Sequence, residues 1–170
     1  YIASLVIAIF SGICNGISPI ISFNYGANNK DRINKILKIA ISTIIIIGIS
    51  STILMIFGGE TLIKMFSKGD AELIRITAEA TKLYSVAFVF NGLNILTSAY
   101  FTALEDAKTS AIISVLRGVI LILIFIIILP IILGDIGIWL TVPASELVTV
   151  FIAINYMKKA DLKIQKMKIA

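Results

Sequence analysis

Two ionisable residues lie inside the long apolar stretches of this 170-residue sequence, and they carry opposite charges. Arg117 lies nine residues after Lys108, and Glu146 lies twelve residues before Lys158. On antiparallel helices their depths differ by only about 5 Å, which a long arginine side chain can bridge. Charges inside a membrane usually face a bundle interior and pair with one another. The sequence therefore predicts an intramembrane ion pair, either a structural salt bridge or a proton-coupled or gating carboxylate.

Two stripes of amide and hydroxyl side chains run through other apolar stretches, at the spacing of a helix face. Buried amides cost free energy unless they are hydrogen-bonded, so both stripes must face other helices or water rather than lipid. They predict either interhelical hydrogen bonds or a polar cavity, in which two aromatic rings before the second stripe would offer π-faces to a cation. We expect a substrate cavity lined by Asn15, Ser18, Tyr84, Phe88, Asn91, Asn94 and Ser98.

The sequence lacks the combinations of residue types that enzymes commonly use for catalysis. The sequence has no histidine and a single cysteine, Cys14, which leaves this thiol without a histidine base to activate it. The usual Cys and His metal sites are absent as well, and no Walker A loop is present to bind ATP. We expect no enzyme activity, no bound cofactor and no metal site.

Five apolar segments have the length that a membrane-spanning helix requires, which is about 20 residues. Because 58% of the residues are apolar and only 15% are charged, a water-soluble globular domain of this size is disfavoured. Helices are expected because backbone groups in lipid must be satisfied within the segment. The fold class is therefore an all-α membrane protein, with a transmembrane bundle over residues 1–157 and a basic tail over 158–170. The expected helices are 2–24, 33–57, 80–104, 109–133 and 137–157.

Glycine and polar residues mark the expected ends of these helices. Gly58-Gly59 predicts the end of the second helix. Asp70 is suited to cap a helix that starts at Ala71 and runs unbroken to Leu104, so that its first turns would project from the membrane.

Lysine and arginine residues are distributed unevenly between the two sides of such a serpentine. Ten of the fifteen lie in the first loop (between the first and second expected helices), the third loop (between the third and fourth) and the C-terminal tail. Alternating helices place these three segments on one side. The positive-inside rule predicts that the first loop and the C-terminus are cytoplasmic and the N-terminus outside. This topology explains the net charge of +5, so the plasma-membrane bilayer is the expected partner and nucleic acid is not.

Several motifs, in order along the chain, resemble the signatures of the MATE family of multidrug and toxic compound extrusion proteins. They are G-x-x-P at Gly16–Pro19 with N-Y-G-A at Asn24–Ala27, Y-F-x-A at Tyr100–Ala103, S-x-x-R at Ser114–Arg117 with Leu129-Pro130, and G-x-W at Gly137–Trp139 with Pro143 and Glu146.

The resemblance implies a secondary transporter of twelve helices in two lobes, which exports amphipathic cationic compounds by antiport with protons or sodium. The five helices would form most of the C-terminal six-helix lobe. Since the chain opens on Tyr1 within an apolar run, we expect a fragment whose partner is the missing N-terminal lobe. Some members carry an acidic cation ligand on the tenth helix. Residues 83–104 contain no acidic residue, which argues against a sodium site in this lobe.

Two other functions stay open. A flippase for lipid-linked oligosaccharides shares this architecture, but its cavity would need more cations than Arg117 alone. A non-transporting membrane scaffold would need neither the aligned polar stripes nor the three prolines of this chain.

Overall fold

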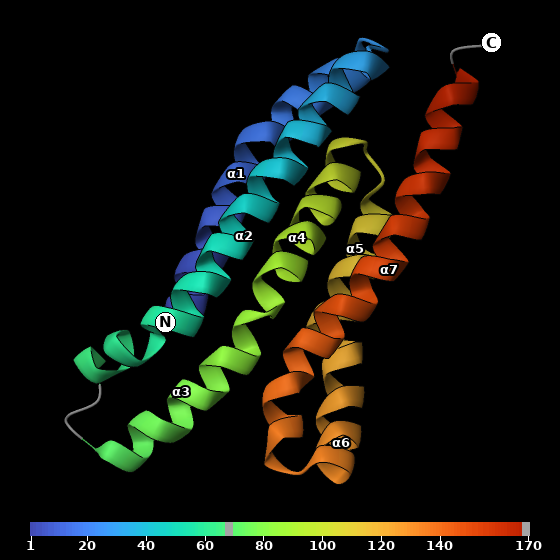
Figure 1. Cartoon of the computed structure of the whole chain (residues 1–170). Helices are drawn as coiled ribbons and strands as arrows, with labels where there is room; N and C mark the ends of the chain where they lie inside the picture. The colour runs from blue at the N-terminus through green and yellow to red at the C-terminus, as the bar shows by residue number, and fades with distance from the viewer. Residues whose placement is uncertain (67–69, 168–170) are drawn as a thin grey trace.

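Helices make up nearly all of this protein, and no strand occurs among the residues that the structure describes. The computed structural model describes the backbone of residues 1–66 and 70–167, and the side chains of residues 1–64 and 70–160. The elements are α1 (Ile2–Gly26), α2 (Lys30–Phe66), α3 (Ala71–Ser85), α4 (Ala87–Ala103), α5 (Ala107–Val115), the π-helix η1 (Leu116–Ile120), α6 (Leu121–Leu133) and α7 (Asp135–Met167) (Figure 1).

Five membrane crossings account for these helices. Four stretches are long and apolar enough to cross a membrane: 2–26, 30–64, 107–133 and 135–160. The fifth consists of α3 and α4, which meet at a bend of 44°. The expected all-α membrane fold with about five transmembrane helices is therefore confirmed.

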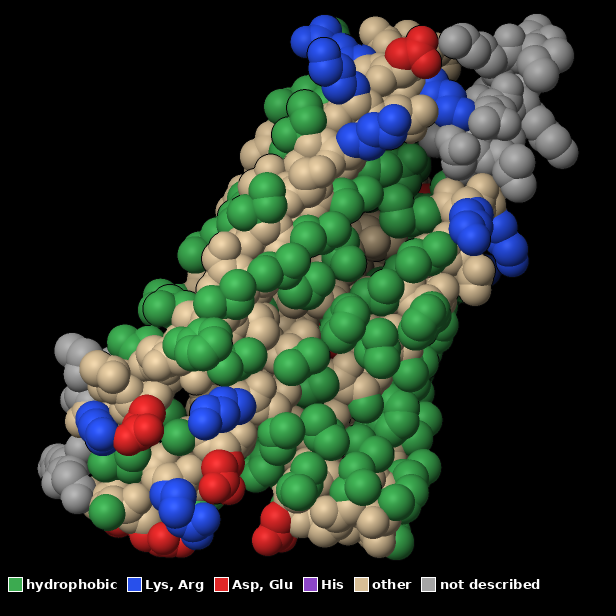
Figure 2. All heavy atoms as spheres, viewed as in Figure 1, with side chains coloured by type: hydrophobic (Ala, Val, Ile, Leu, Met, Phe, Trp, Pro, Cys, Tyr) green, Lys and Arg blue, Asp and Glu red, His purple; other side chains and the backbone are tan. Residues whose placement is uncertain are grey.

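The helices run in alternating directions, so their connections fall at the two ends of the molecule (Figure 1). The α1–α2 and α4–α5 connections lie at one end together with the C-terminal end of α7. We call this the basic end; its described lysines and arginines are Lys30, Arg32, Lys35, Lys38, Lys108, Lys158 and Lys159. The α6–α7 connection, the end of α2 and the start of α3 lie at the opposite end. Charged side chains gather at both ends and leave an apolar belt between them (Figure 2).

The second helix is longer than the sequence predicts. It continues through Gly58-Gly59 and ends at Phe66. Each glycine costs a helix only about 1 kcal/mol relative to alanine. The extension buries Ile63, which is 8% exposed. Burial of Ile63 thus offsets the cost of the two glycines, and the local sequence does not indicate this contact.

The third crossing is broken, whereas the sequence predicts one helix from Ala71 to Leu104. Asp70 caps α3 as expected, accepting hydrogen bonds from the backbone N–H groups of Glu72 and Leu73. The helix then bends at Val86, and the hydroxyl of Thr52 on α2 donates to the carbonyl of Ser85 at 2.8 Å. A side chain from a neighbouring helix thus satisfies a carbonyl at the bend, and the local sequence does not indicate this contact.

The centre of the bundle is α4, which contacts α1, α2, α5 and α7. Gly92 allows this close packing: a Cβ atom there would lie 2.6 Å from Cγ2 of Ile44 and 3.0 Å from Cζ of Phe10. Both of those side chains are fully buried. Gly92 therefore has no room for even a methyl group.

We expect Gly92→Ala to reduce the amount of folded protein, because overpacking a core costs about 1–3 kcal/mol. Gly58→Ala is the matched control, since its Cβ would meet only Cδ1 of Leu54 at an ordinary 3.5 Å. Thermal unfolding of the purified protein measures both variants. A Gly92→Ala variant as stable as Gly58→Ala would contradict the close approach.

Candidate functional site

An ion pair lies in the middle of the bundle, between α7 and the π-helix η1. Nε of Arg117 lies 3.8 Å from Oε1 of Glu146. The glutamate is buried, with 4% of its surface exposed, while the arginine side chain is 20% exposed. The structure therefore brings together the two ionisable residues that the sequence singled out, across the antiparallel α5–η1–α6 and α7 segments.

Two amides of α4 hold the same carboxylate. Nδ2 of Asn91 donates to Oε1 of Glu146 at 2.9 Å, and Nδ2 of Asn94 donates to Oε2 at 2.6 Å. Asn94 also donates to the backbone carbonyl of Glu146. Both asparagines are buried, and neither Oδ1 atom has a hydrogen-bond partner among the described residues. The site therefore contains two buried acceptors that the present arrangement leaves unused.

Irregular helix geometry surrounds this cluster. Arg117 belongs to η1, the five-residue π-helix that interrupts the α5–α6 crossing. One of its terminal nitrogens, Nη1, donates to the backbone carbonyl of Asn91 at 3.4 Å. The bend between α3 and α4 at Val86 lies five residues before Asn91. Short π-segments occur frequently at functional sites, and here one presents the only arginine found within the described membrane crossings away from their ends.

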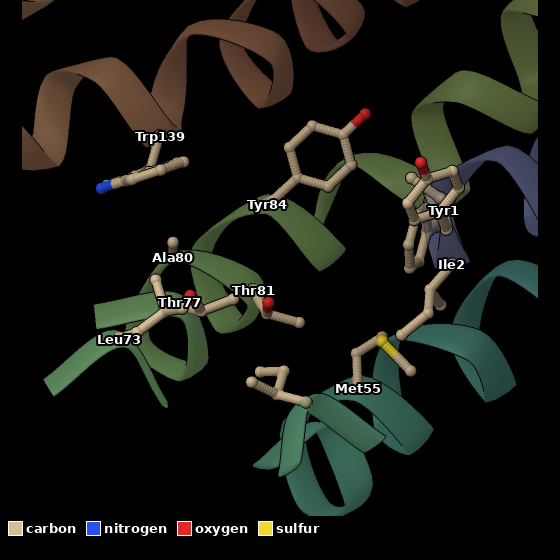
Figure 3. Close-up of a pocket in the computed structure, with 12 residues that line it drawn as sticks. Tyr1, Ile2, Met55, Leu73, Thr77, Ala80, Thr81, Tyr84 and Trp139 are labelled. Atoms are coloured by element: carbon tan, nitrogen blue, oxygen red, sulfur yellow. The ribbon is translucent and has the colours of Figure 1, made fainter. Parts of the chain in front are cut away.

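A cavity of about 470 Å³ opens near the end of the molecule opposite the basic end. It lies between the starts of α1 and α7, the end of α2 and the α3–α4 bend (Figure 3). Tyr84 and Trp139 face it from α3 and α7, Phe88 lines it from α4, and Met55 lies across from them on α2. Its size falls within the range of small-molecule sites, and its wall is mostly apolar.

This cavity adjoins the ion pair along two helices. Trp139 and Glu146 are seven residues apart and so share one face of α7, about 10 Å apart along its axis. Tyr84 lies close enough to Glu146 and Arg117 to interact with both charges. Sequence analysis missed Trp139 as a cavity residue, although its spacing of seven from Glu146 was the signal that could have found it.

The expected cavity residues fall in four separate places rather than in one. Tyr84 and Phe88 line the apolar cavity, whereas Asn91 and Asn94 hold Glu146. Ser98 lies nearer the basic end, where its backbone carbonyl and hydroxyl accept hydrogen bonds from α5. The fourth place is the surface of α1, which carries Asn15 and Ser18.

The polar stripe of α1 does not line the pocket or join the Glu146 cluster. Asn15 is exposed, and the half-buried Ser18 donates to the backbone carbonyl of Cys14 on its own helix. Phe10 and Cys14 are packed instead into the core that α1 shares with α4, where close van der Waals packing holds the helices together. The expected approach of this stripe to Asn91 and Asn94 is not found among the described residues.

The donor set of the described residues offers no metal centre. No group of three or more histidine, cysteine, aspartate or glutamate side chains lies together within the described part of the chain. In the Glu146 cluster, carboxylate and amide groups lie together, but the guanidinium of Arg117 already supplies a positive charge there.

Comparison with known proteins agrees with this architecture. A sequence model of the MatE family matches residues 1–134. This chain belongs to the MatE family. The family that the motifs resembled is thereby confirmed. The match ends at the α6–α7 connection, before the helix that carries Glu146.

Relatives of this MatE chain include two staphylococcal proteins. It is 28% identical over 114 residues to the Multidrug export protein MepA of Staphylococcus saprophyticus, covering 67% of this chain and 25% of that protein. The protein of the same name from Staphylococcus haemolyticus is 22% identical over 160 residues, covering 93% of this chain and 35% of that protein. The chain thus spans about a quarter to a third of these relatives' length.

Solved MATE structures share the fold. An outward-facing multidrug resistance MATE family transporter superposes with a TM-score of 0.88 at 18% identity, over 97% of this chain and 37% of that one. A MATE in complex with MaL6 gives a TM-score of 0.90 at 16% identity, over 97% of this chain and 38% of that one. The helices described above therefore have the arrangement of part of a MATE transporter.

Proposed function

We propose that this chain forms most of the C-terminal lobe of a transporter that exports amphipathic cationic compounds by antiport with protons or sodium. Its relatives are named multidrug export proteins, and membership of the MatE family supports the same activity here. The apolar cavity beside Tyr84 and Trp139 offers aromatic faces on which a lipophilic cation can stack, and Glu146 supplies a nearby carboxylate.

The observation that carries the proposal is the pair of unused amide oxygens beside Glu146. When Glu146 is ionised, the N–H groups of Asn91 and Asn94 donate to its two carboxylate oxygens. When Glu146 is protonated, half a turn of the Asn91 amide presents an oxygen that accepts the new O–H, while Asn94 keeps its bond to the backbone carbonyl of Glu146. The amides can therefore satisfy both protonation states within a buried site.

The charge of Arg117 favours a proton over sodium at this carboxylate. A sodium ion bound at Glu146 would lie close to the guanidinium, and two like charges a few ångströms apart repel strongly away from water. The guanidinium opposes a proton on Glu146 as well, but a proton forms a covalent O–H bond and needs no ligand shell, whereas sodium needs several oxygen ligands around it. We therefore propose Glu146 as a proton-binding residue and place no sodium site in this lobe.

Transport assays on the complete transporter test this function. In everted membrane vesicles, ethidium should accumulate when a proton gradient is imposed, and this accumulation should stop when the gradient is collapsed. A sodium gradient alone should not replace it. Accumulation driven only by sodium would refute proton coupling, and no accumulation of any lipophilic cation under either gradient would refute drug antiport.

The membrane orientation is a separate proposal. The basic end carries the first loop, the third loop and the C-terminal end of α7, so the positive-inside rule places it in the cytoplasm. Of the remaining residues that contribute to this charge asymmetry, Lys68 and Lys168 lie outside the described residues, and the side chains of Lys163 and Lys166 are not described.

Cysteine labelling in intact cells measures the orientation. A cysteine at Asn29, at the tip of the first loop, should resist an impermeant thiol reagent added outside, whereas one at Glu72 on the opposite end should react. Both side chains are exposed, so access alone decides the result. Labelling of Asn29→Cys but not Glu72→Cys would mean that the orientation is inverted.

A further inference from the structure

A cluster of four hydroxyl side chains lies between α4 and α5, and neither the ion pair nor the apolar cavity uses it. Thr102 donates to the hydroxyl oxygen of Ser110 at 2.9 Å, and Ser110 donates to the backbone carbonyl of Ser98 at 2.9 Å. The hydroxyl of Ser114 donates to that of Ser98 at 3.3 Å. We call Ser98, Thr102, Ser110 and Ser114 the hydroxyl cluster.

The hydroxyl cluster occupies the space between the Glu146 site and the basic end. Ser98 follows Asn94 by one turn of α4, and Ser114 precedes Arg117 by one turn on the same face of its helix. Ser110 lies about 10 Å from Arg117 along the axis, close to the α4–α5 connection. A row of polar groups therefore runs from the buried carboxylate to the α4–α5 loop at Glu105 and Asp106.

Burial within the cluster argues that it meets water or polypeptide rather than lipid. Thr102 and Ser114 are exposed, and Ser98 and Ser110 are half-buried. The hydroxyl oxygens of Thr102 and Ser114 can still accept hydrogen bonds, which water offers and lipid tails do not, whereas the next residue, Val115, is 49% exposed and suits a lipid-facing position. Ser114 and Val115, which are neighbours on α5, thus lie at the same depth, but Ser114 favours contact with water and Val115 favours contact with lipid.

We propose that the hydroxyl cluster is the path by which protons pass between Glu146 and water at the basic end. This rests on the proposed function, because it requires Glu146 to bind and release a proton. Along the path each hydroxyl or bridging water accepts one proton and releases another toward the loop, so no bond other than O–H is made or broken and no charge is left behind. Water must bridge the carboxylate of Glu146 and the hydroxyls of Ser98 and Ser114, because the guanidinium of Arg117 cannot accept a proton.

The groups that face Glu146 give the path its direction. Arg117 approaches from η1 and the two amides from α4, while Tyr84 interacts from the side of the apolar cavity. The path ends at the α4–α5 loop, where Glu105 is exposed. A proton leaving Glu146 toward the basic end therefore avoids the aromatic wall of the cavity.

Hydration of the path is tested by thiol reactivity in the complete transporter, in a background without other cysteines. Ser114→Cys and Val115→Cys place thiols at one depth. An impermeant anionic methanethiosulfonate added at the basic end should modify Ser114→Cys at least about tenfold faster, since only a hydrated thiol ionises and reacts. Equal rates, or faster labelling from the opposite end, would overturn the path.

Proton flux supplies the second readout, which separates this inference from the proposed function. Ser98→Ala/Ser114→Ala should slow proton-driven ethidium uptake about tenfold per transporter molecule, whereas loss of structural hydrogen bonds would lower the amount of folded protein instead. If Glu146→Gln abolishes coupling but the double alanine variant exchanges protons at the original rate, the path is wrong and the proposed function stands. If Glu146→Gln retains coupling, Glu146 is not the proton site and both proposals fail.

Discussion

Glu146→Gln should abolish proton-driven export by the complete transporter while the protein still folds in the membrane. Glutamine has the shape of the protonated glutamate but cannot release a proton. Its side-chain oxygen can accept from Asn94 as the carboxylate does, and its N–H group can donate to the unused Oδ1 of Asn91 after that amide turns. The structural contacts are therefore replaceable, and the titrating group is not.

Ethidium uptake and transporter amount should be measured in the same vesicles. Uptake in the Glu146→Gln vesicles should fall to the level of vesicles that lack the transporter, with an unchanged amount of protein in the membrane. Phe151→Leu is the matched control, because Phe151 lies on the exposed side of the same helix, 62% exposed. Normal proton-driven ethidium uptake by the Glu146→Gln variant would mean that Glu146 has only a structural role.

Arg117→Met should destabilise the folded protein more than Gly92→Ala does. It removes the positive partner and leaves the charge of Glu146 buried among apolar helices. Breaking a buried ion pair in this way typically costs about 3–5 kcal/mol. The methionine chain occupies a similar path, so loss of charge rather than loss of volume should dominate the effect.

A double-mutant cycle isolates the pair. Arg117→Met/Glu146→Gln removes both charges and should recover much of the folded protein, although not proton-driven export. The exchange Arg117→Glu/Glu146→Arg should recover a part, since it restores both charges but not the hydrogen bonds that Asn91 and Asn94 donate to the carboxylate. Thermal unfolding in detergent that shows additive effects would mean that the two residues are not coupled.

The membrane-spanning helices could be predicted from the sequence because the bilayer imposes a simple rule. Apolar runs of about 20 residues must become helices, and alternating helices place the basic loops at one end. The same rule singled out Arg117 and Glu146, since a charge in such a run must find a partner. The structure places them 3.8 Å apart.

Tertiary packing decided what the local pattern leaves open. The helical stripe of Asn91 and Asn94 must avoid lipid, but only the position of α7 turns those amides onto Glu146 and so separates them from the cavity. At the bend near Val86 the hydroxyl of Thr52, from another helix, donates to the carbonyl of Ser85, and the continuation of α2 past Gly58-Gly59 buries Ile63.

The sequence by itself determined the membrane class, the five crossings and the opposed charges at mid-depth, because each follows from residue type and spacing along one helix. Its motifs also resembled the family that the MatE model shows. Tertiary structure decided which polar face meets which neighbour, where the chain bends, and that Trp139 and Tyr84 share a cavity. The physical reason is that lipid constrains each helix separately through its own backbone and apolar length. Contacts between helices depend instead on side chains that are distant in the chain, such as Thr52 with Ser85 and Asn94 with Glu146.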